Sequence, residues 1–226
     1  MAQSIDIPSE ADQKQDRQKN NLADRQEHEP ADKHAFRQAL FLGDSLTWGY
    51  DVPRGKGWVE LLAEEHKDID FINAGLNGDT LQGMTNRFEE RYAGGSYKFV
   101  FLMGGTNDIL MGRDGASCFR KIAKLGERIA ASQTPVIIGV PMEIVWELAD
   151  EGAVIRSYRE QLLAFCQQKG WTYIDFYKVL HTAGERGENV FDGDVHPNEK
   201  GYQYMYELAA KILRPYLRAG EVKPDI

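Results

Sequence analysis

The sequence predicts an α/β protein, a three-layer α/β/α sandwich with a mainly parallel five-stranded sheet. Two observations support this prediction. From residue 35 onward, short apolar runs alternate with longer segments of helical periodicity, which is typical of β-α units around a parallel sheet. The chain has 226 residues, 42% of them hydrophobic, and this is enough for one sizeable core in a single domain.

Five short apolar runs are the expected strands. In chain order they are residues 39–42, 71–73, 99–103, 136–140 and 171–176. Amphipathic segments fill the gaps and are the expected helices, at residues 58–66, 81–92, 118–131, 153–169 and 199–213. The last of these carries Tyr202, Met205 and Ala209 at helical spacing, which gives it one apolar face for the sheet.

Residues 1–34 differ from the rest of the chain in composition. They are rich in Gln, Asp, Glu, Lys, Arg and Asn and contain no aromatic residue, so they cannot bury enough apolar surface to order themselves. We expect a polar, disordered tail at 1–34 and one folded domain at 35–226. The tail has neither an apolar signal-peptide core nor a long hydrophobic stretch, which predicts a cytoplasmic protein without membrane insertion.

Charge and metal-type residues exclude several function classes. With 27 basic and 35 acidic residues the formal net charge is -8, which disfavours a nucleic-acid partner. His28 and His34 are separated by Pro30, which interrupts any helix that would gather them into a metal site. Cys118 and Cys166 are expected to be buried thiols rather than a disulfide. We therefore expect no metal and no organic cofactor.

Four short motifs lie at or near the ends of predicted strands or before the last helix. They are Gly43-Asp44-Ser45-Leu46, Asn73-Ala74-Gly75, Gly104-Gly105-Thr106-Asn107-Asp108 and Asp192-Gly193-Asp194-Val195-His196-Pro197. Open parallel sheets bind ligands at the carboxyl ends of their strands, so Ser45, Gly75 and Asn107 are expected to converge there.

As a set, these motifs resemble those of the SGNH hydrolases, also called GDSL esterases and lipases, and the resemblance extends over residues 35–217. It implies a flavodoxin-like sandwich, a nucleophile at Ser45 and its base at His196. It also implies an oxyanion hole formed by the backbone amides of Ser45 and Gly75 and the side-chain amide of Asn107.

The chemistry explains why those residue types are needed. A serine hydroxyl is a poor nucleophile until a neighbouring imidazole accepts its proton. N–H donors aimed at the developing oxyanion lower the barrier, and one such donor is typically worth about 3 kcal/mol. A glycine without a Cβ lets the backbone approach a substrate closely.

The acid that orients His196 is where the chain departs from the family pattern. The family usually has an aspartate three residues before the histidine, and here that position is Gly193. Asp192 and Asp194 flank it, and either carboxylate is a candidate for His196 Nδ1. Asp44 and Asp108, by contrast, are expected to hydrogen-bond local backbone amides.

Apolar residues near the predicted strand ends are candidates for either a substrate pocket or the core. They are Trp48, Met111, Met142, Ile144, Val145 and Trp146. The two interpretations are equally consistent with the sequence.

The sequence therefore predicts a serine esterase that cleaves a carboxylic ester or thioester of a small soluble molecule through an acyl-enzyme on Ser45. A carbohydrate O-deacetylase is the alternative that would use the same site. An alternative of another class is a non-catalytic flavodoxin-like module that binds phosphate or flavin on the loop 43–49. A scaffold with an inactive site is a third. The oligomeric state does not follow from the sequence.

Overall fold

A central sheet of five parallel strands organises the computed structural model, which describes residues 37–144, 149–193 and 195–218. The strands are β1 (Gln38–Gly43), β2 (Asp70–Gly75), β3 (Phe99–Leu102), β4 (Val136–Val140) and β5 (Thr172–Asp175), in the order β2-β1-β3-β4-β5. Every neighbouring pair is parallel. The predicted sheet is confirmed, whereas the predicted tail at 1–34 lies outside the described residues and stays a prediction.

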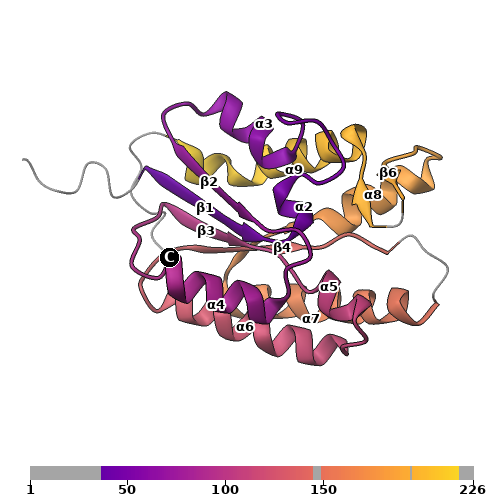
Figure 1. Cartoon of the computed structure of the whole chain (residues 1–226), viewed down its shortest axis with the longest axis horizontal. Coiled ribbons are helices and arrows are strands. Elements are labelled where there is room, and N and C mark those ends of the chain that lie inside the picture. Colours follow the sequence, from indigo (N-terminus) through magenta and orange to yellow (C-terminus); the bar gives the residue numbers. More distant parts are fainter. Residues whose placement is uncertain (1–36, 145–148, 194, 219–226) are drawn as a thin grey trace, which may run out of the picture. The chain divides into compact units, whose positions relative to one another are not determined.

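Helices cover both faces of the sheet (Figure 1). One face packs against α4 (Leu81–Arg91), α6 (Gly115–Ala130) and α7 (Ala149–Lys169). The other packs against α3 (Trp58–Glu65), α8 (Phe176–Glu185) and α9 (Glu199–Leu217). The three-layer α/β/α architecture is thus the one the sequence predicts.

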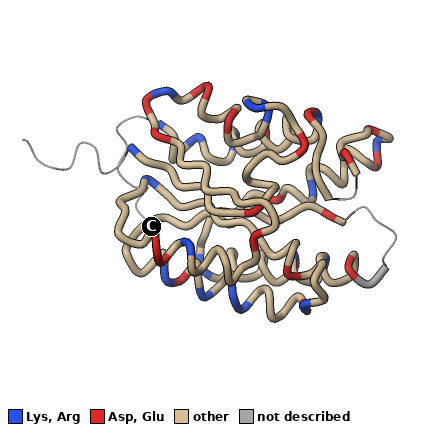
Figure 2. Tube along the Cα trace, viewed as in Figure 1, with Lys and Arg blue, Asp and Glu red and all other residues tan. Residues whose placement is uncertain are grey.

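The inner strands β1, β3 and β4 are buried on both faces, as their continuous apolar runs require, whereas the edge strands β2 and β5 are partly exposed. Along β1, Leu40 belongs to the core on one side of the sheet, while Ala39 and Phe41 belong to the core on the other. The inner strands β1, β3 and β4 carry no charged residue. Figure 2 shows the charged positions mainly on the helices and loops around them.

Several short elements were not predicted. They are the helices α2 (Ser45–Trp48) and α5 (Thr106–Leu110), and the strands β6 (Phe191–Asp192) and β7 (His196–Pro197), which pair antiparallel. The helix α8 was also missed, although Asp175 caps it by accepting from the Lys178 N–H at 3.1 Å. Two to five residues are too few to show a hydrophobic period, so only the structure reveals the shortest of these elements.

Two glycines bring the short helices to the carboxyl edge of the sheet. A Cβ at Gly43, where β1 ends, would lie 2.0 Å from Thr47 Oγ1, so only glycine lets α2 turn back against the strand. Gly105 has φ +108° and begins α5 in a conformation that other residues rarely adopt. These turns place Ser45 and Asn107 at neighbouring strand ends.

Cys118 and Cys166 are both buried and unbonded, which confirms that prediction. No helix in the described part of the chain is both long enough and apolar enough to span a membrane.

Candidate active site

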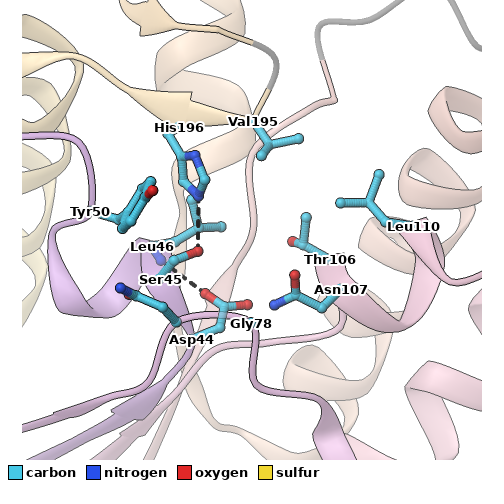
Figure 3. Close-up of a pocket in the computed structure, with 11 residues that line it drawn as sticks. Asp44, Ser45, Leu46, Tyr50, Gly78, Thr106, Asn107, Leu110, Val195 and His196 are labelled. Carbon is cyan, nitrogen blue, oxygen red and sulfur yellow. Dashed lines mark hydrogen bonds between the residues drawn. The ribbon is translucent and has the colours of Figure 1, made fainter.

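A pocket of about 420 Å³ opens at the carboxyl end of the sheet. Figure 3 shows the residues that line it, and they come from the segments after β1, β2 and β3 and from β7. They are Asp44, Ser45, Leu46, Tyr50, Asn77, Gly78, Thr106, Asn107, Leu110, Val195 and His196. Three of the four predicted motifs therefore contribute directly to one cavity.

Ser45 and His196 meet in this pocket although 151 positions separate them in the chain. Ser45 Oγ lies 3.0 Å from His196 Nε2. Ser45 is the first residue of α2, and Asp44 caps that helix by accepting from the Leu46 N–H at 3.0 Å. A hydroxyl held against an imidazole nitrogen is the geometry that nucleophilic catalysis by serine requires.

The other ring nitrogen of His196 contacts a carboxylate that the sequence did not single out. Asp51 Oδ2 lies 3.2 Å from His196 Nδ1, and the Asp51 side chain is 39% exposed. Asp51 has φ +66°, a left-handed conformation that aspartate tolerates better than most residues. The Tyr50 ring lies beside the imidazole, with 4.6 Å between ring centroids. The loop after α2 therefore holds His196 on two sides.

The structure describes only one of the two predicted acids, Asp192 and Asp194. Asp192 pairs with His196 in the β6–β7 ladder, but within the described residues its exposed carboxylate makes no hydrogen bond or ion pair. Asp194 lies outside the described residues. No spacing rule in the sequence would have identified Asp51, since its partner lies far along the chain.

The structure corrects the expectation for Gly75. Its N–H donates to Asn73 Oδ1 at 3.0 Å, and Gly75 does not line the pocket. A Cβ there would lie 2.3 Å from the Trp48 backbone nitrogen, so this glycine lets α2 pack against β2 rather than letting a substrate approach. Gly78, three residues later, lines the pocket instead with φ +74°. The Gly78 N–H makes no hydrogen bond to any described residue.

Asn107 lies where the sequence predicts. Its Nδ2 donates one hydrogen bond to the Asp79 carbonyl at 2.9 Å, which fixes the amide at the edge of the pocket. The same nitrogen carries a second hydrogen. That hydrogen is available to a group bound in the pocket, beside the Gly78 and Ser45 amides (Figure 3).

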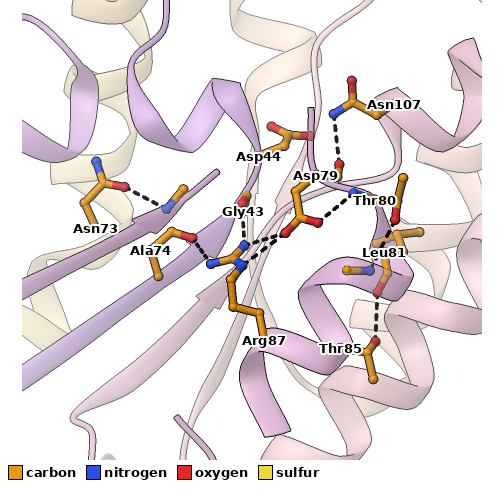
Figure 4. Close-up of polar contacts among 12 residues, drawn as sticks. Gly43, Asp44, Asn73, Ala74, Asp79, Thr80, Leu81, Thr85, Arg87 and Asn107 are labelled. Carbon is orange, nitrogen blue, oxygen red and sulfur yellow. Dashed lines mark hydrogen bonds and ion pairs between the residues drawn. The ribbon is translucent and has the colours of Figure 1, made fainter. Parts of the chain in front are cut away.

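A partly buried arginine, Arg87, anchors the loop that carries Gly78 (Figure 4). Arg87 donates from Nη2 to the Gly43 carbonyl at 3.0 Å and to Asp79 Oδ2 at 2.6 Å, and from Nη1 to the Ala74 carbonyl. One guanidinium thus ties the ends of β1 and β2 to Asp79, whose carbonyl in turn holds Asn107.

Asp44 hydrogen-bonds local backbone, as expected, whereas the backbone partner of Asp108 is 27 positions away in the chain. Asp108 Oδ2 accepts from the Leu81 N–H at 2.8 Å, and its other oxygen lies 3.2 Å from Lys121 Nζ. Asp44 is different because its second oxygen, Oδ2, is buried and has no hydrogen-bond partner in the described part of the chain. Burial raises the pKa of Asp44 from 3.8 to about 7.

The apolar candidates divide between rim and core. Met142 and Ile144 are buried in the core, whereas Val145 and Trp146 lie outside the described residues. Five of the large hydrophobic side chains that are exposed follow β1, β2 or β3 closely in the chain: Trp48, Tyr50, Leu76, Leu110 and Met111. Tyr50 and Leu110 also line the pocket, so apolar surface adjoins it. The described residues contain no group of three or more His, Cys, Asp or Glu placed to hold a metal ion.

Comparisons with known proteins agree with this geometry. An arylesterase from Vibrio mimicus is 35% identical over 194 residues, which are 83% of this chain and 93% of that protein. The crystal structure of a member of the lipolytic protein G-D-S-L family from Veillonella parvula has a TM-score of 0.74 and 37% sequence identity, and covers 78% of this chain and 98% of that chain. A third match, to the uncharacterized lipoprotein YqeF of Bacillus subtilis, is 33% identical over 86 residues and spans only 35% of each protein.

One relative is thus named a lipoprotein, and the cytoplasmic location stays a prediction. The model of the GDSL-like Lipase/Acylhydrolase family matches residues 41–204, which run from within β1 into α9 and hold the pocket and all four motifs. This chain is a member of the GDSL-like lipase/acylhydrolase family, and one of the relatives above is named an arylesterase.

Proposed function

We propose that the protein hydrolyses a carboxylic ester or thioester through an acyl-enzyme on Ser45. The observation that supports this most strongly is the 3.0 Å contact between Ser45 Oγ and His196 Nε2, inside a pocket that also presents Asn107 and Gly78. Membership of an esterase family agrees with it.

In the first half of the reaction, Ser45 Oγ attacks the carbonyl carbon while His196 Nε2 takes the hydroxyl proton. Asp51 accepts a hydrogen bond from Nδ1–H and stabilises the imidazolium that forms. The carbonyl oxygen becomes negative, and three donors face it: the Ser45 N–H, the Gly78 N–H and Asn107 Nδ2.

The tetrahedral intermediate then collapses. The bond to the leaving alcohol or thiol breaks, and His196 returns the proton to that group, which leaves Ser45 acylated. Water attacks the acyl carbon with His196 again as base, and the second collapse releases the carboxylic acid and restores the Ser45 hydroxyl. The cycle consumes one water and needs no redox partner.

The exposed side chains indicate the class of ester. Leu110 is 44% exposed and Tyr50 is 40% exposed, although both line the pocket, and Met111 beside Leu110 is 67% exposed. Exposed apolar side chains that gather at a pocket often mark a site for an apolar ligand. We propose a small ester with an alkyl or aryl group, and the arylesterase relative supports this choice. The family match gives no support to the O-deacetylase or to the phosphate- or flavin-binding module.

The test is steady-state hydrolysis of nitrophenyl esters of increasing acyl length by the wild type and by Ser45→Ala. The matched control is Ser132→Ala, because Ser132 does not line the pocket and its Oγ donates to the Ile129 carbonyl at the end of α6. We expect Ser45→Ala to lose turnover by more than about 10³-fold while Ser132→Ala keeps it. Equal rates for Ser45→Ala and the wild type would overturn the proposal.

A further inference from the structure

Among the described residues that line the pocket, Asp44 is the one buried titratable side chain that the mechanism above does not use. Its side chain is fully buried, and it sits on the floor of the pocket beside Ser45 and Asn107 (Figure 3). Oδ1 accepts from the Leu46 N–H at 3.0 Å. Oδ2 has no partner in residues 37–144, 149–193 and 195–218, and Figure 4 also shows this carboxyl next to Asn107. A buried carboxylate oxygen without a donor is costly, whereas a neutral carboxyl can place a donor there.

No cation neutralises Asp44 within the described residues. The nearby Arg87 pairs with Asp79 at 2.6 Å, and Lys121 pairs with Asp108 at 3.2 Å. Burial is the largest cause of the raised pKa of Asp44, which is about 7. The negative charges of Asp79 and Asp108 raise this pKa further, whereas the hydrogen bond from the Leu46 N–H lowers it.

The remaining titratable groups around Asp44 add no compensating charge. Tyr158 on α7 donates to the Gly104 carbonyl at 2.9 Å, and Tyr202 lies on α9. Burial raises the pKa of both phenols above the ordinary value, so both are neutral. His196 approaches from β7 on the other side of Ser45 (Figure 3).

We propose that Asp44 is a positioning residue that must carry a proton for the ester reaction to proceed. This inference rests on the proposed function. In the neutral form, Oδ1 fixes the start of α2 and Oδ2–H faces the pocket floor. In the ionised form, a negative charge would lie beside the place where the oxyanion develops and would oppose it.

The sign of the pH effect follows from these two forms. The neutral carboxyl predominates below about pH 7 and the carboxylate above it. Turnover must therefore fall on the alkaline side, by about 50-fold between pH 7 and pH 9 for a single group with that midpoint. The free energy of unfolding is expected to fall with rising pH as well. A group whose pKa is raised in the folded state contributes stability that is lost as the pH rises through about 7.

The experiment compares the ratio of kcat/KM at pH 9 to that at pH 7 in three proteins. Asp44→Asn keeps an acceptor for the Leu46 N–H and a donor in place of Oδ2–H, but cannot ionise. The matched control is Asp114→Asn, because Asp114 caps α6 in the same way, accepting from the Ser117 N–H at 2.7 Å, away from the pocket. We expect the ratio to be at least tenfold higher in Asp44→Asn than in the other two. A wild type without an alkaline decline, or a decline that persists in Asp44→Asn, would overturn the proposal.

A measurement without catalysis separates this inference from the proposed function. Urea unfolding of Ser45→Ala and of Ser45→Ala/Asp44→Asn is followed between pH 5 and pH 8.5. We expect the urea midpoint of the first to fall with pH relative to that of the second. Parallel midpoints would overturn the proton on Asp44 even if the enzyme hydrolyses esters. If the urea midpoint falls as expected but the wild type hydrolyses no ester, the result supports a protonated Asp44 and counts only against the proposed function.

Discussion

Asp51 Oδ2 lies 3.2 Å from His196 Nδ1, while Ser45 Oγ lies 3.0 Å from the Nε2 of the same ring. A serine, an imidazole and a carboxylate thus form one chain of contacts, and the serine and carboxylate both come from the short segment after β1. We expect the carboxylate to hold the imidazole so that Nε2 faces the serine.

The Asp51 contact predicts the effect of Asp51→Asn. We expect kcat/KM for a nitrophenyl ester to fall about 10²-fold, less than for a fully buried acid because Asp51 is 39% exposed. Asparagine also tolerates the left-handed conformation at φ +66°, so the fold is expected to persist. Asp192→Asn and Asp194→Asn are measured alongside. If one of these loses activity while Asp51→Asn does not, Asp51 is not the orienting acid.

Because Gly78, and not Gly75, lines the pocket, substitutions of Gly78 and of the control Gly55 are expected to differ in their effect on kcat. Gly78→Ala and Gly55→Ala both place a Cβ in open space at positive φ, +74° and +86°, so each is expected to lower stability by roughly 1 kcal/mol. Only Gly78 faces the pocket, so only Gly78→Ala is expected to reduce kcat, by about tenfold or more. Thermal unfolding and ester hydrolysis check the pair. An equal loss of kcat in both variants would argue against Gly78 as an oxyanion donor.

The Asn107 amide predicts a loss in kcat rather than in binding. Asn107→Ala removes a donor that acts on the developing oxyanion, and we expect kcat to fall about 10²- to 10³-fold with little change in KM. The control is Asn86→Ala, because Asn86 accepts a hydrogen bond from Gln82 on the exposed face of α4. An effect of Asn107→Ala on KM alone would contradict this role.

The buried contact between Arg87 and Asp79 predicts a stability effect. Their side chains are 12% and 7% exposed, so Arg87→Met leaves an unpaired buried carboxylate and is expected to lower the free energy of unfolding by about 3 kcal/mol. Arg128→Met breaks the exposed pair with Glu89 and is expected to cost less than about 1 kcal/mol. Urea unfolding measures both, and equal losses would show that Arg87 is not a special anchor.

The inner strands β1, β3 and β4 were predictable because burial on both faces leaves a continuous apolar run in the sequence. The run at 39–42, for example, lies inside β1 (Gln38–Gly43). The choice between Gly75 and Gly78 was not predictable in this way. Gly78 lies three residues beyond the motif that contains Gly75, and which N–H faces the pocket depends on the backbone turn after β2. Asp51 could not be predicted because its contact with His196 is created by folding and corresponds to no fixed spacing in the sequence.

Covalent labelling of Ser45 tests the central claim most directly. The folded wild type is treated with a fluorophosphonate, which reacts with activated serines, and the modified peptide is identified by mass spectrometry. We expect one adduct, on Ser45, which His196→Ala abolishes and Asp114→Asn retains. An adduct on another serine, or none in folded protein that hydrolyses esters, would contradict the assignment of Ser45 as the nucleophile.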